Sequence, residues 1–312
     1  MKNLLFFALV IAFCSLFAKA QAVKSDADIE KLLPRLSNWG KWGKDDQVGT
    51  LNYLDDKKVT VAARLIKTGK TVVLARQIDI LRTPGVQEGK REILFRELGT
   101  RDNTGAIWHG FALTHLDALC HIFANKTEMY NGIPVTEINK ERCEKLGIDI
   151  IAARGISGRG VLLDIAGLKG APLEPGTAIY VKDLEDAAKR QKLKMRSGDI
   201  VFIRTGAGMK NTRDRRAGLH PECLLWAKER EIALMGSDGD SDVAPVENFD
   251  RYASAFHSVG IPYLGLPLID NAELDALAAE CERQKRWEFY VTIAPWNLKG
   301  GTSSPVNPVA VF

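Results

Sequence analysis

Histidine and cysteine are both scarce in this chain, with five of each in 312 residues. No two cysteines form a C-x-x-C pair, which excludes the paired-cysteine zinc and redox motifs. An excess of one charge is lacking too, because 43 basic residues face 39 acidic ones. Such a balance gives no electrostatic attraction for nucleic acid or an anionic membrane, so neither is an expected partner.

Linkers and repeats are also missing. No Pro/Ser-rich stretch, low-complexity run or internal repeat divides the chain. Gly206 and Gly208 in "RTGAG" lack the third glycine and the following helix of a dinucleotide-binding fingerprint. The sequence therefore predicts one domain over residues 21–312, without that cofactor motif.

Residues 1–20 have the order of a secretory signal peptide. Lys2 precedes an apolar run over residues 4–17, and "AKA" at 18–20 supplies the small residues of a cleavage site. The apolar run is too short for a comfortable membrane span. We therefore expect a mature protein without a membrane segment, located in a periplasm or secreted.

Four cysteines remain after this leader, and their spacing is wide and irregular: Cys120, Cys143, Cys223 and Cys281. In an oxidising compartment they allow two disulfides. A chain of this length can bury a large core without such bonds, so free, buried thiols are the expectation.

Strand-like and helix-like segments alternate along the chain. Runs rich in β-branched and apolar residues predict strands within residues 71–80, 160–166, 198–206 and 287–295. Helical spacing predicts helices within residues 58–69, 183–191, 220–231 and 271–286, the last three starting near Asp183, Pro221 and Asn271. The pattern is typical of a single mixed-sheet α/β domain, here preceded by an N-terminal arm.

Three of the five histidines stand together with an aspartate in "HGFALTHLDALCH", from His109 to His121. The residues around them suit a strand better than a helix. Alternate side chains of an extended chain share one face, so His109, His115 and Asp117 are expected to point the same way. His121 has the same parity if the chain stays extended.

Neutral imidazoles combined with a carboxylate suit Zn²⁺ or Mn²⁺, and a further histidine nearby can move protons at neutral pH. The alternative is a group of hydrogen-bonded core histidines beside an aspartate that holds a turn. We favour metal chemistry, because burying four such polar groups without partners is costly.

The stretch "THLDALCH" resembles the H-x-D-x-x-x-H core of the cyclase family, which comprises metal-dependent hydrolases such as bacterial kynurenine formamidase and isatin hydrolase. The resemblance extends over nearly the whole mature chain. It includes "WGKWGKDDQVGTLNYL", "GDIVFIRTG", "GLHPECLLWAKEREIALMGSDGDSD", "IPYLGLPLIDNAELDAL" and "GGTSSPVNPVAVF". The fold that it implies is a swivelling β/β/α-type domain that assembles as a homodimer or homotetramer.

The resemblance also implies roles for individual residues. His115 and Asp117 match the metal-binding positions of the motif, and His121 matches the catalytic acid/base. Family members add a later histidine and an acidic or amide residue about a dozen positions beyond it. His257 and Asp270 are the candidates here.

The chain departs from the family motif in two places. Phe111 stands where the formamidase motif H-x-G-T-H has its first ligand, and Leu119 stands where the motif has proline. The first change weakens the case for a two-metal site and for formamidase activity. His109 could replace the missing ligand if the strand bends or bulges. It could equally be a structural or substrate-contacting residue.

Aromatic residues are candidates for substrate contacts. Trp39 and Trp42 could form a wall for a planar substrate or anchor the N-terminal arm, and Phe111 could line the same pocket. The remaining histidine, His220, precedes Pro221 where a helix should begin, so capping or packing is its expected role.

The resulting hypothesis is an enzyme that hydrolyses carbon–nitrogen bonds other than peptide bonds, in a small amide, lactam or related cyclic carbonyl compound. A divalent metal would activate water, and His121 would serve as acid and base. Two alternatives stay open. One is lactone or ester hydrolysis, or the reverse cyclisation; the other is an exported, non-catalytic metal-binding protein.

Overall fold

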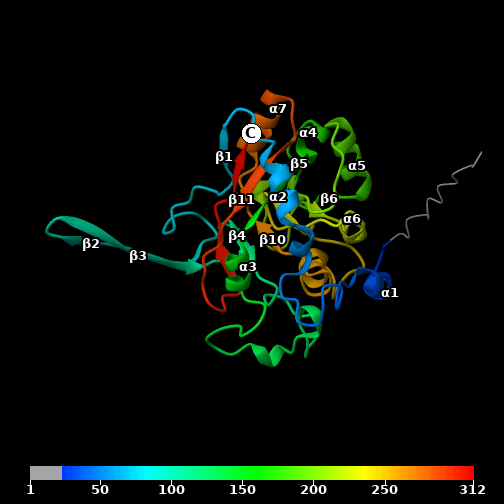
Figure 1. The fold of residues 1–312 in the computed structure, drawn as a ribbon, viewed down its shortest axis with the longest axis horizontal. Coiled ribbons are helices and arrows are strands. Elements are labelled where there is room, and N and C mark those ends of the chain that lie inside the picture. Colours follow the sequence, from blue (N-terminus) through cyan, green and yellow to red (C-terminus); the bar gives the residue numbers. More distant parts are fainter. Residues whose placement is uncertain (1–22) are drawn as a thin grey trace, which may run out of the picture.

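A computed structural model describes residues 23–312, and the predicted signal peptide at residues 1–20 lies outside them. Within the described part, one curled mixed sheet of nine strands forms the centre of a single α/β domain (Figure 1). This confirms the predicted fold class. The strands run in the spatial order β1-β13-β11-β5-β7-β9-β10-β4-β12.

The strands of this sheet are β1 (Thr71–Val73), β4 (His115–Asp117), β5 (Ile156–Asp164), β7 (Ile200–Arg204), β9 (Leu234–Ser237), β10 (Leu268–Asp270), β11 (Glu288–Ile293), β12 (Ser303–Pro305) and β13 (Val309–Val311). Two smaller ribbons pair β2 (Gln87–Arg96) with β3 (Gly99–Ile107), and β6 (Ala178–Ile179) with β8 (Gly218–Leu219).

The α-helices are α1 (Asp26–Leu36), α2 (Asp56–Ala63), α3 (Ile148–Arg154), α4 (Ile165–Lys169), α5 (Val181–Arg190), α6 (Cys223–Glu229) and α7 (Asp275–Gln284). Short 3₁₀ turns are η1 (Gly49–Tyr53), η2 (Tyr130–Gly132), η3 (Val135–Glu137) and η4 (Gly208–Lys210), and η5 (Phe256–Leu264) is a π-helix. No helix among residues 23–312 has the length and apolar character needed to cross a membrane.

Four neighbouring strands, β5, β7, β9 and β10, run parallel and form the middle of the sheet. Their apolar runs are buried along most of their length, as expected for strands covered on both faces. Helices α2, α5 and α7 all pack against β5. On one side of this core, β4 joins β10 in antiparallel register, so the histidine-rich segment sits next to the carboxyl ends of parallel strands.

Several predicted boundaries are shifted. The strand expected over residues 71–80 ends at Val73, and the helix expected to begin near Asn271 begins at Asp275. Asp183 is the third residue of α5 rather than its start, and its carboxylate accepts a hydrogen bond from the Tyr180 backbone N–H at 2.9 Å. This reciprocal cap explains why the helix starts earlier.

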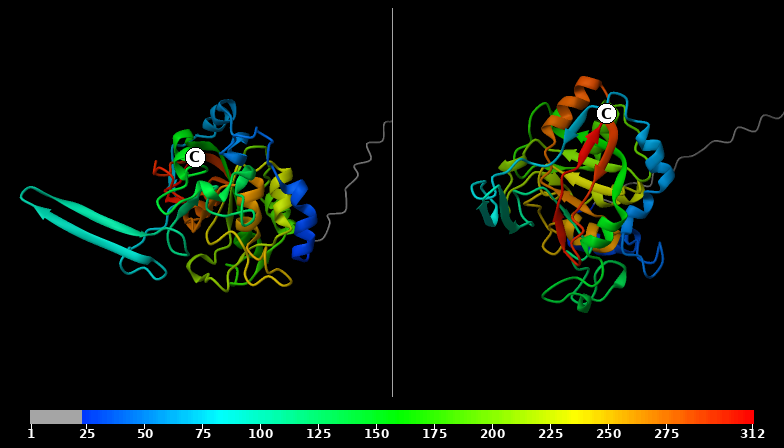
Figure 2. Two further views of the ribbon diagram at one scale, coloured as in Figure 1. Left: turned by 90° about the horizontal axis from the view of Figure 1, so that it is seen from below. Right: turned by 60° about the vertical axis from the view of Figure 1, so that its left-hand side comes forward.

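The hairpin formed by β2 and β3 was not foreseen. It projects from the body of the molecule as a two-stranded arm (Figures 1 and 2). Its tip exposes apolar side chains, with Phe95 83% and Leu98 97% accessible. The strands have no alternating apolar face to fill a core, which is why the sequence pattern gave no strand signal there.

Candidate metal centre

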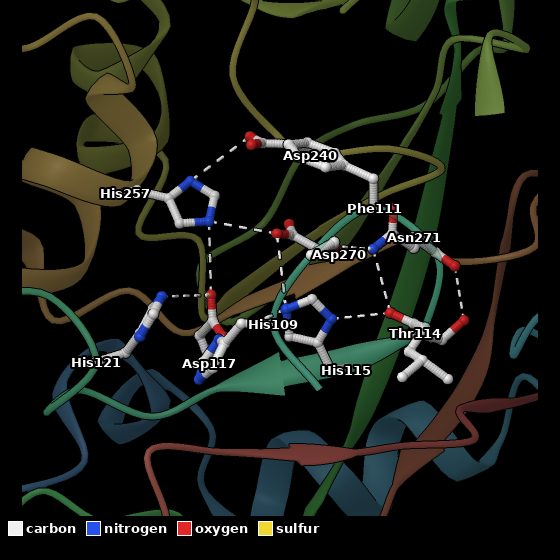
Figure 3. Close-up of polar contacts among 12 residues, drawn as sticks. His109, Phe111, Thr114, His115, Asp117, His121, Asp240, His257, Asp270 and Asn271 are labelled. Carbon is white, nitrogen blue, oxygen red and sulfur yellow. Dashed lines mark hydrogen bonds and ion pairs between the residues drawn. The ribbon is translucent and has the colours of Figure 1, made fainter. Parts of the chain in front are cut away.

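Three elements bring the candidate ligands together. Strand β4 carries His115 and Asp117, and β10 ends with Asp270, whose Cα lies opposite that of His115 in the antiparallel register. The π-helix η5 supplies His257 near its first residue. Figure 3 shows these side chains converging on Asp117. π-helical segments are rare and are frequently found at functional sites.

The structure corrects the extended strand expected from His109 onwards. Only His115 to Asp117 is a strand, and the chain bends between His109 and Leu113. Gly110 has φ +140°, and the Asn271 side-chain amide donates to the carbonyls of Gly110 and Leu113 at 2.7 and 3.1 Å. This bend brings His109 Nδ1 to 3.2 Å from Asp117 Oδ1.

Asp117 is the centre of the cluster and is 1% exposed. Its Oδ1 lies 3.2 Å from His109 Nδ1 and 3.5 Å from His115 Nε2. Its Oδ2 lies 3.5 Å from His257 Nε2. Asp270 Oδ2 in turn lies 3.3 Å from His257 Nε2 and 3.9 Å from His115 Nε2.

The rings of His109, His115 and His257 each have one nitrogen within hydrogen-bond distance of a group outside the cluster, here called the outer partner. His115 Nδ1 lies 2.8 Å from the Leu113 carbonyl, and His109 Nε2 lies 3.1 Å from Thr302 Oγ1. His257 Nδ1 lies 2.7 Å from Asp242 Oδ2. In all three, the other nitrogen faces Asp117. Outer partners of this kind fix the ring orientation of metal-binding histidines.

Buried polar atoms at the centre lack hydrogen-bond partners. They are His109 Nδ1, both carboxylate oxygens of Asp117 and Oδ1 of Asp270. Leaving such atoms buried and unpartnered is costly, whereas a divalent cation would satisfy them together. Three sets of ligand atoms among the described residues each lie within 4.8 Å of one another, namely His109/His115/Asp117, Asp117/His257/Asp270 and Asp240/Asp242/His257. The donors therefore fit a divalent metal, and Asp117 belongs to the first two sets, which contain the unpartnered atoms.

Charge at the centre favours a cation. Burial disfavours the protonated form of His257, but the carboxylates of Asp240, Asp270, Asp117 and Asp242 outweigh it and raise the His257 pKa well above its usual value. Burial by itself would raise the pKa of Asp117, yet the surrounding imidazoles hold it well below the ordinary value. Carboxylates so concentrated attract positive charge to this point.

His121 is placed differently from the other histidines. Its ring stacks on that of His109 with centroids 3.9 Å apart, and its Nε2 lies 4.0 Å from Asp117 Oδ2. The side chain is about one quarter exposed to the cavity. Burial lowers the pKa of His121 to about 4, although Asp117 opposes the shift. A neutral imidazole at pH 7 can accept a proton.

A cavity of about 950 Å³ opens over the cluster. Phe111 forms part of its wall, and the Arg216 guanidinium lies 6.0 Å from the Phe111 ring centroid. Arg213 also lines the cavity, and Gln87 and Ile107 contribute from the base of the hairpin. Space for a small organic molecule is therefore continuous with the candidate ligands.

Trp39 and Trp42 do not line this cavity. Trp39 stacks on Tyr263 with centroids 5.8 Å apart and donates from Nε1 to the Pro262 carbonyl at 2.8 Å. Trp42 meets Tyr53 edge-on. Both tryptophans therefore pack the segment after α1 onto the domain.

The last histidine lies outside the cluster. His220 Nδ1 accepts the Glu222 backbone N–H at 3.3 Å, just ahead of α6. Its placement agrees with the expected capping role.

Two outer residues of the site were not identified from sequence. Asp242 lies in the acid-rich segment "GSDGDSD" at the end of β9, where the local pattern does not distinguish it from Asp238 and Asp240. The structure turns the Asp238 carboxylate away, to the Thr205 and Gly206 N–H groups. Thr302 comes from a distant segment with no local signal, so only the pairing of β12 with β4 reveals it.

Comparison with known proteins agrees with this geometry. A family model described as putative cyclase matches residues 71–241. The crystal structure of a novel cyclase is 30% identical, with a TM-score of 0.79, over 88% of this chain and 99% of the other. No curated protein matches the chain.

More distant structures share the fold. Isatin hydrolase A from Ralstonia solanacearum is 18% identical, with a TM-score of 0.57, over 78% of this chain and 92% of its own. Isatin hydrolase A from Labrenzia aggregata is 16% identical, with a TM-score of 0.55, over 77% and 93%. The family model and the 30% identical structure together place the chain: it belongs to the cyclase family.

Proposed function

We propose that this protein is a metal-dependent hydrolase of a small amide, lactam or related cyclic carbonyl compound. One observation carries the proposal. Both carboxylate oxygens of Asp117 are buried without hydrogen-bond partners and face three imidazoles, each oriented by an outer partner. Such an arrangement is costly for a structural core and suits a metal centre.

Residues on both sides of Asp117 would hold metal. His109 and His115 would bind on the Oδ1 side, and His257 with Asp270 on the Oδ2 side. His109 would thus replace the ligand that Phe111 does not provide. Mixed nitrogen and oxygen donors suit Zn²⁺ or Mn²⁺. We propose two ions for each chain, with Asp117 shared between them.

A bound divalent ion polarises a carbonyl and lowers the pKa of bound water toward ~7. His121 is the proposed acid and base. Its neutral imidazole faces the cavity, accepts a proton from the attacking water and returns it to the leaving nitrogen. Stacking on His109 holds the ring beside the ligands without using either of its nitrogens.

The cavity supports a small, planar substrate. Its volume of about 950 Å³ suits a single-ring or two-ring compound, and Phe111 offers a flat apolar wall. Amide hydrolysis creates a carboxylate, which the Arg213 guanidinium at the cavity could bind. The name isatin hydrolase, borne by two proteins of the same fold, supports a cyclic amide.

The test is hydrolysis by metal-loaded mature protein of three compounds: isatin, an N-formyl arylamine and an aryl lactone. We expect turnover of at least one of the two nitrogen compounds, and its loss in Asp117→Ala. Turnover of the lactone alone would favour the ester-hydrolase alternative. Bound metal without turnover of any of them would favour a non-catalytic binding protein.

We further propose export and self-association. The signal-peptide pattern at residues 1–20 supports a periplasmic or secreted location. N-terminal sequencing of the mature protein tests this, and a start near Gln21 is expected.

The exposed apolar hairpin tip supports a homodimer or homotetramer, because isolated two-stranded hairpins are only marginally stable in water.

A further inference from the structure

Two of the four cysteines lie side by side in the structure. Cys120 and Cys143, which 22 residues separate in the sequence, both lie against the Gly300–Gly301 segment, and each thiol is close enough to shift the pKa of the other. Both residues are buried, with exposures of 1% and 3%. Their spacing in the sequence gave no reason to pair these two among the four.

The backbone holds the two residues in place independently of their thiols. The Cys143 N–H donates to the Gly300 carbonyl at 2.9 Å, and the Cys120 N–H donates to the Leu146 carbonyl at 3.2 Å. Cys120 Sγ lies 4.0 Å from the Gly301 carbonyl. The same Gly300–Gly301 segment therefore contacts both cysteines.

This segment leads directly to the candidate metal centre. Thr302 follows Gly301, and its hydroxyl lies 3.1 Å from His109 Nε2. The Thr302 carbonyl also accepts the Ala118 N–H at 3.0 Å, at the end of β4. On the other side, Cys120 immediately precedes His121. The thiol pair thus lies beneath the turn that carries the proposed acid/base.

We propose that Cys120 and Cys143 form a disulfide when the protein meets a disulfide oxidant, and that this bond fixes the base of the candidate metal centre. The bond would close the loop of residues 121–142 and hold it against Gly300 and Gly301. The inference does not depend on hydrolase activity, because it concerns only the two thiols and the segments that they join.

The chemistry is thiol–disulfide exchange with an oxidant such as glutathione disulfide. The Cys143 thiolate attacks one sulfur of the oxidant, forming a mixed disulfide and releasing one glutathione thiolate. The Cys120 thiolate then attacks the Cys143 sulfur, which forms the internal S–S bond and releases the second glutathione. Two S–H protons pass to the released glutathione thiolates, and two electrons reduce the oxidant.

The order of attack follows from the environment of each thiol. The neighbouring Cys120 thiol lowers the pKa of Cys143, because it stabilises the thiolate there. The same contact, together with burial, raises the pKa of Cys120. Cys143 is therefore the better initial nucleophile. Burial of both residues means that oxidation occurs during folding or local opening, and that the finished bond is shielded from reductants.

The first experiment counts thiols in the full mature protein. The reduced protein is refolded with glutathione disulfide, transferred to denaturant that already contains excess iodoacetamide, and digested for mass spectrometry. We expect a linked peptide pair containing Cys120 and Cys143, with Cys223 and Cys281 alkylated. Alkylation of all four cysteines, or a bond that involves Cys223 or Cys281, would overturn the proposal.

Matched variants and a stability measurement complete the test. Cys143→Ser should abolish the linked peptide, whereas Cys223→Ser, a buried cysteine on α6, should leave it unchanged. In wild-type protein, the oxidised form should melt roughly 5 to 10 °C above the reduced form. Equal melting temperatures despite a formed bond would show that it does not fix this part of the fold. The wild-type comparison remains decisive if Cys143→Ser fails to fold.

Discussion

Asp242 fixes His257 through both its backbone and its ring. The Asp242 carboxylate accepts the backbone N–H of Phe256 at 2.7 Å and that of His257 at 3.2 Å, at the start of η5. Its Oδ2 also lies 2.7 Å from His257 Nδ1. One buried carboxylate therefore sets the position of the helix end and the direction in which His257 Nε2 points.

Asp242→Asn is expected to weaken metal binding about 10- to 100-fold. The neutral amide holds the Nδ1 side of the His257 ring less firmly than the carboxylate does, so the ring is less well fixed with Nε2 directed at the metal. Isothermal titration with Zn²⁺ measures the effect. Asp250→Asn, on the exposed segment just before η5, is the matched control and should bind like wild type. Equal affinities in the two variants would mean that Asp242 only caps the helix.

Metal stoichiometry distinguishes one proposed ion from two. Wild-type protein should contain about two Zn²⁺ or Mn²⁺ per chain. His109→Ala and His257→Ala should each lose about one ion, since they bind on opposite sides of Asp117. Asp117→Ala should lose both. Plasma mass spectrometry of the purified proteins gives the numbers.

His220→Ala is the control for that series, because His220 caps the start of α6 outside the cluster. It should keep the wild-type metal content. The proposal would be contradicted if wild-type protein contained only one ion and His109→Ala retained it. His109 would then be a structural residue.

His121→Ala separates proton transfer from metal binding. The variant should keep both ions, because the His121 Nε2 lies 4.0 Å from Asp117 Oδ2 and the ring stacks on a ligand rather than joining the set. The kcat should fall by about 10²- to 10⁴-fold, the usual contribution of a positioned acid/base. Loss of metal in this variant would instead identify His121 as a ligand.

Local sequence patterns predicted the α/β fold class, and the family resemblance identified most of the clustered residues. The apolar runs of β5, β7 and β11 predicted strands at the right places, because buried strands need such residues. The family resemblance pointed to His115, Asp117, His121, His257 and Asp270, which the structure brings into one cavity.

Contacts between residues far apart in the sequence could not be predicted from it. The bend that brings His109 to Asp117 is held by Asn271, more than 150 residues away, so an extended strand was the natural expectation from local pattern alone. The pairing of Cys120 with Cys143 likewise depends on the distant Gly300–Gly301 segment. The spacing of apolar residues predicts which face of a helix or strand a residue occupies. It does not predict which residues of a distant segment it will contact.

The β2–β3 hairpin allows a direct test of self-association. Its tip exposes Phe95 and Leu98, and few soluble monomers expose apolar side chains together at the end of such an arm. We expect the double variant Phe95→Lys/Leu98→Lys to reduce the molar mass measured by light scattering after size exclusion, relative to an oligomeric wild type. Asn103→Lys, which adds one positive charge to the same hairpin without removing an apolar side chain, should keep the wild-type mass. A monomeric wild type would refute self-association, and an unchanged mass in the double variant would place the interface away from the hairpin tip.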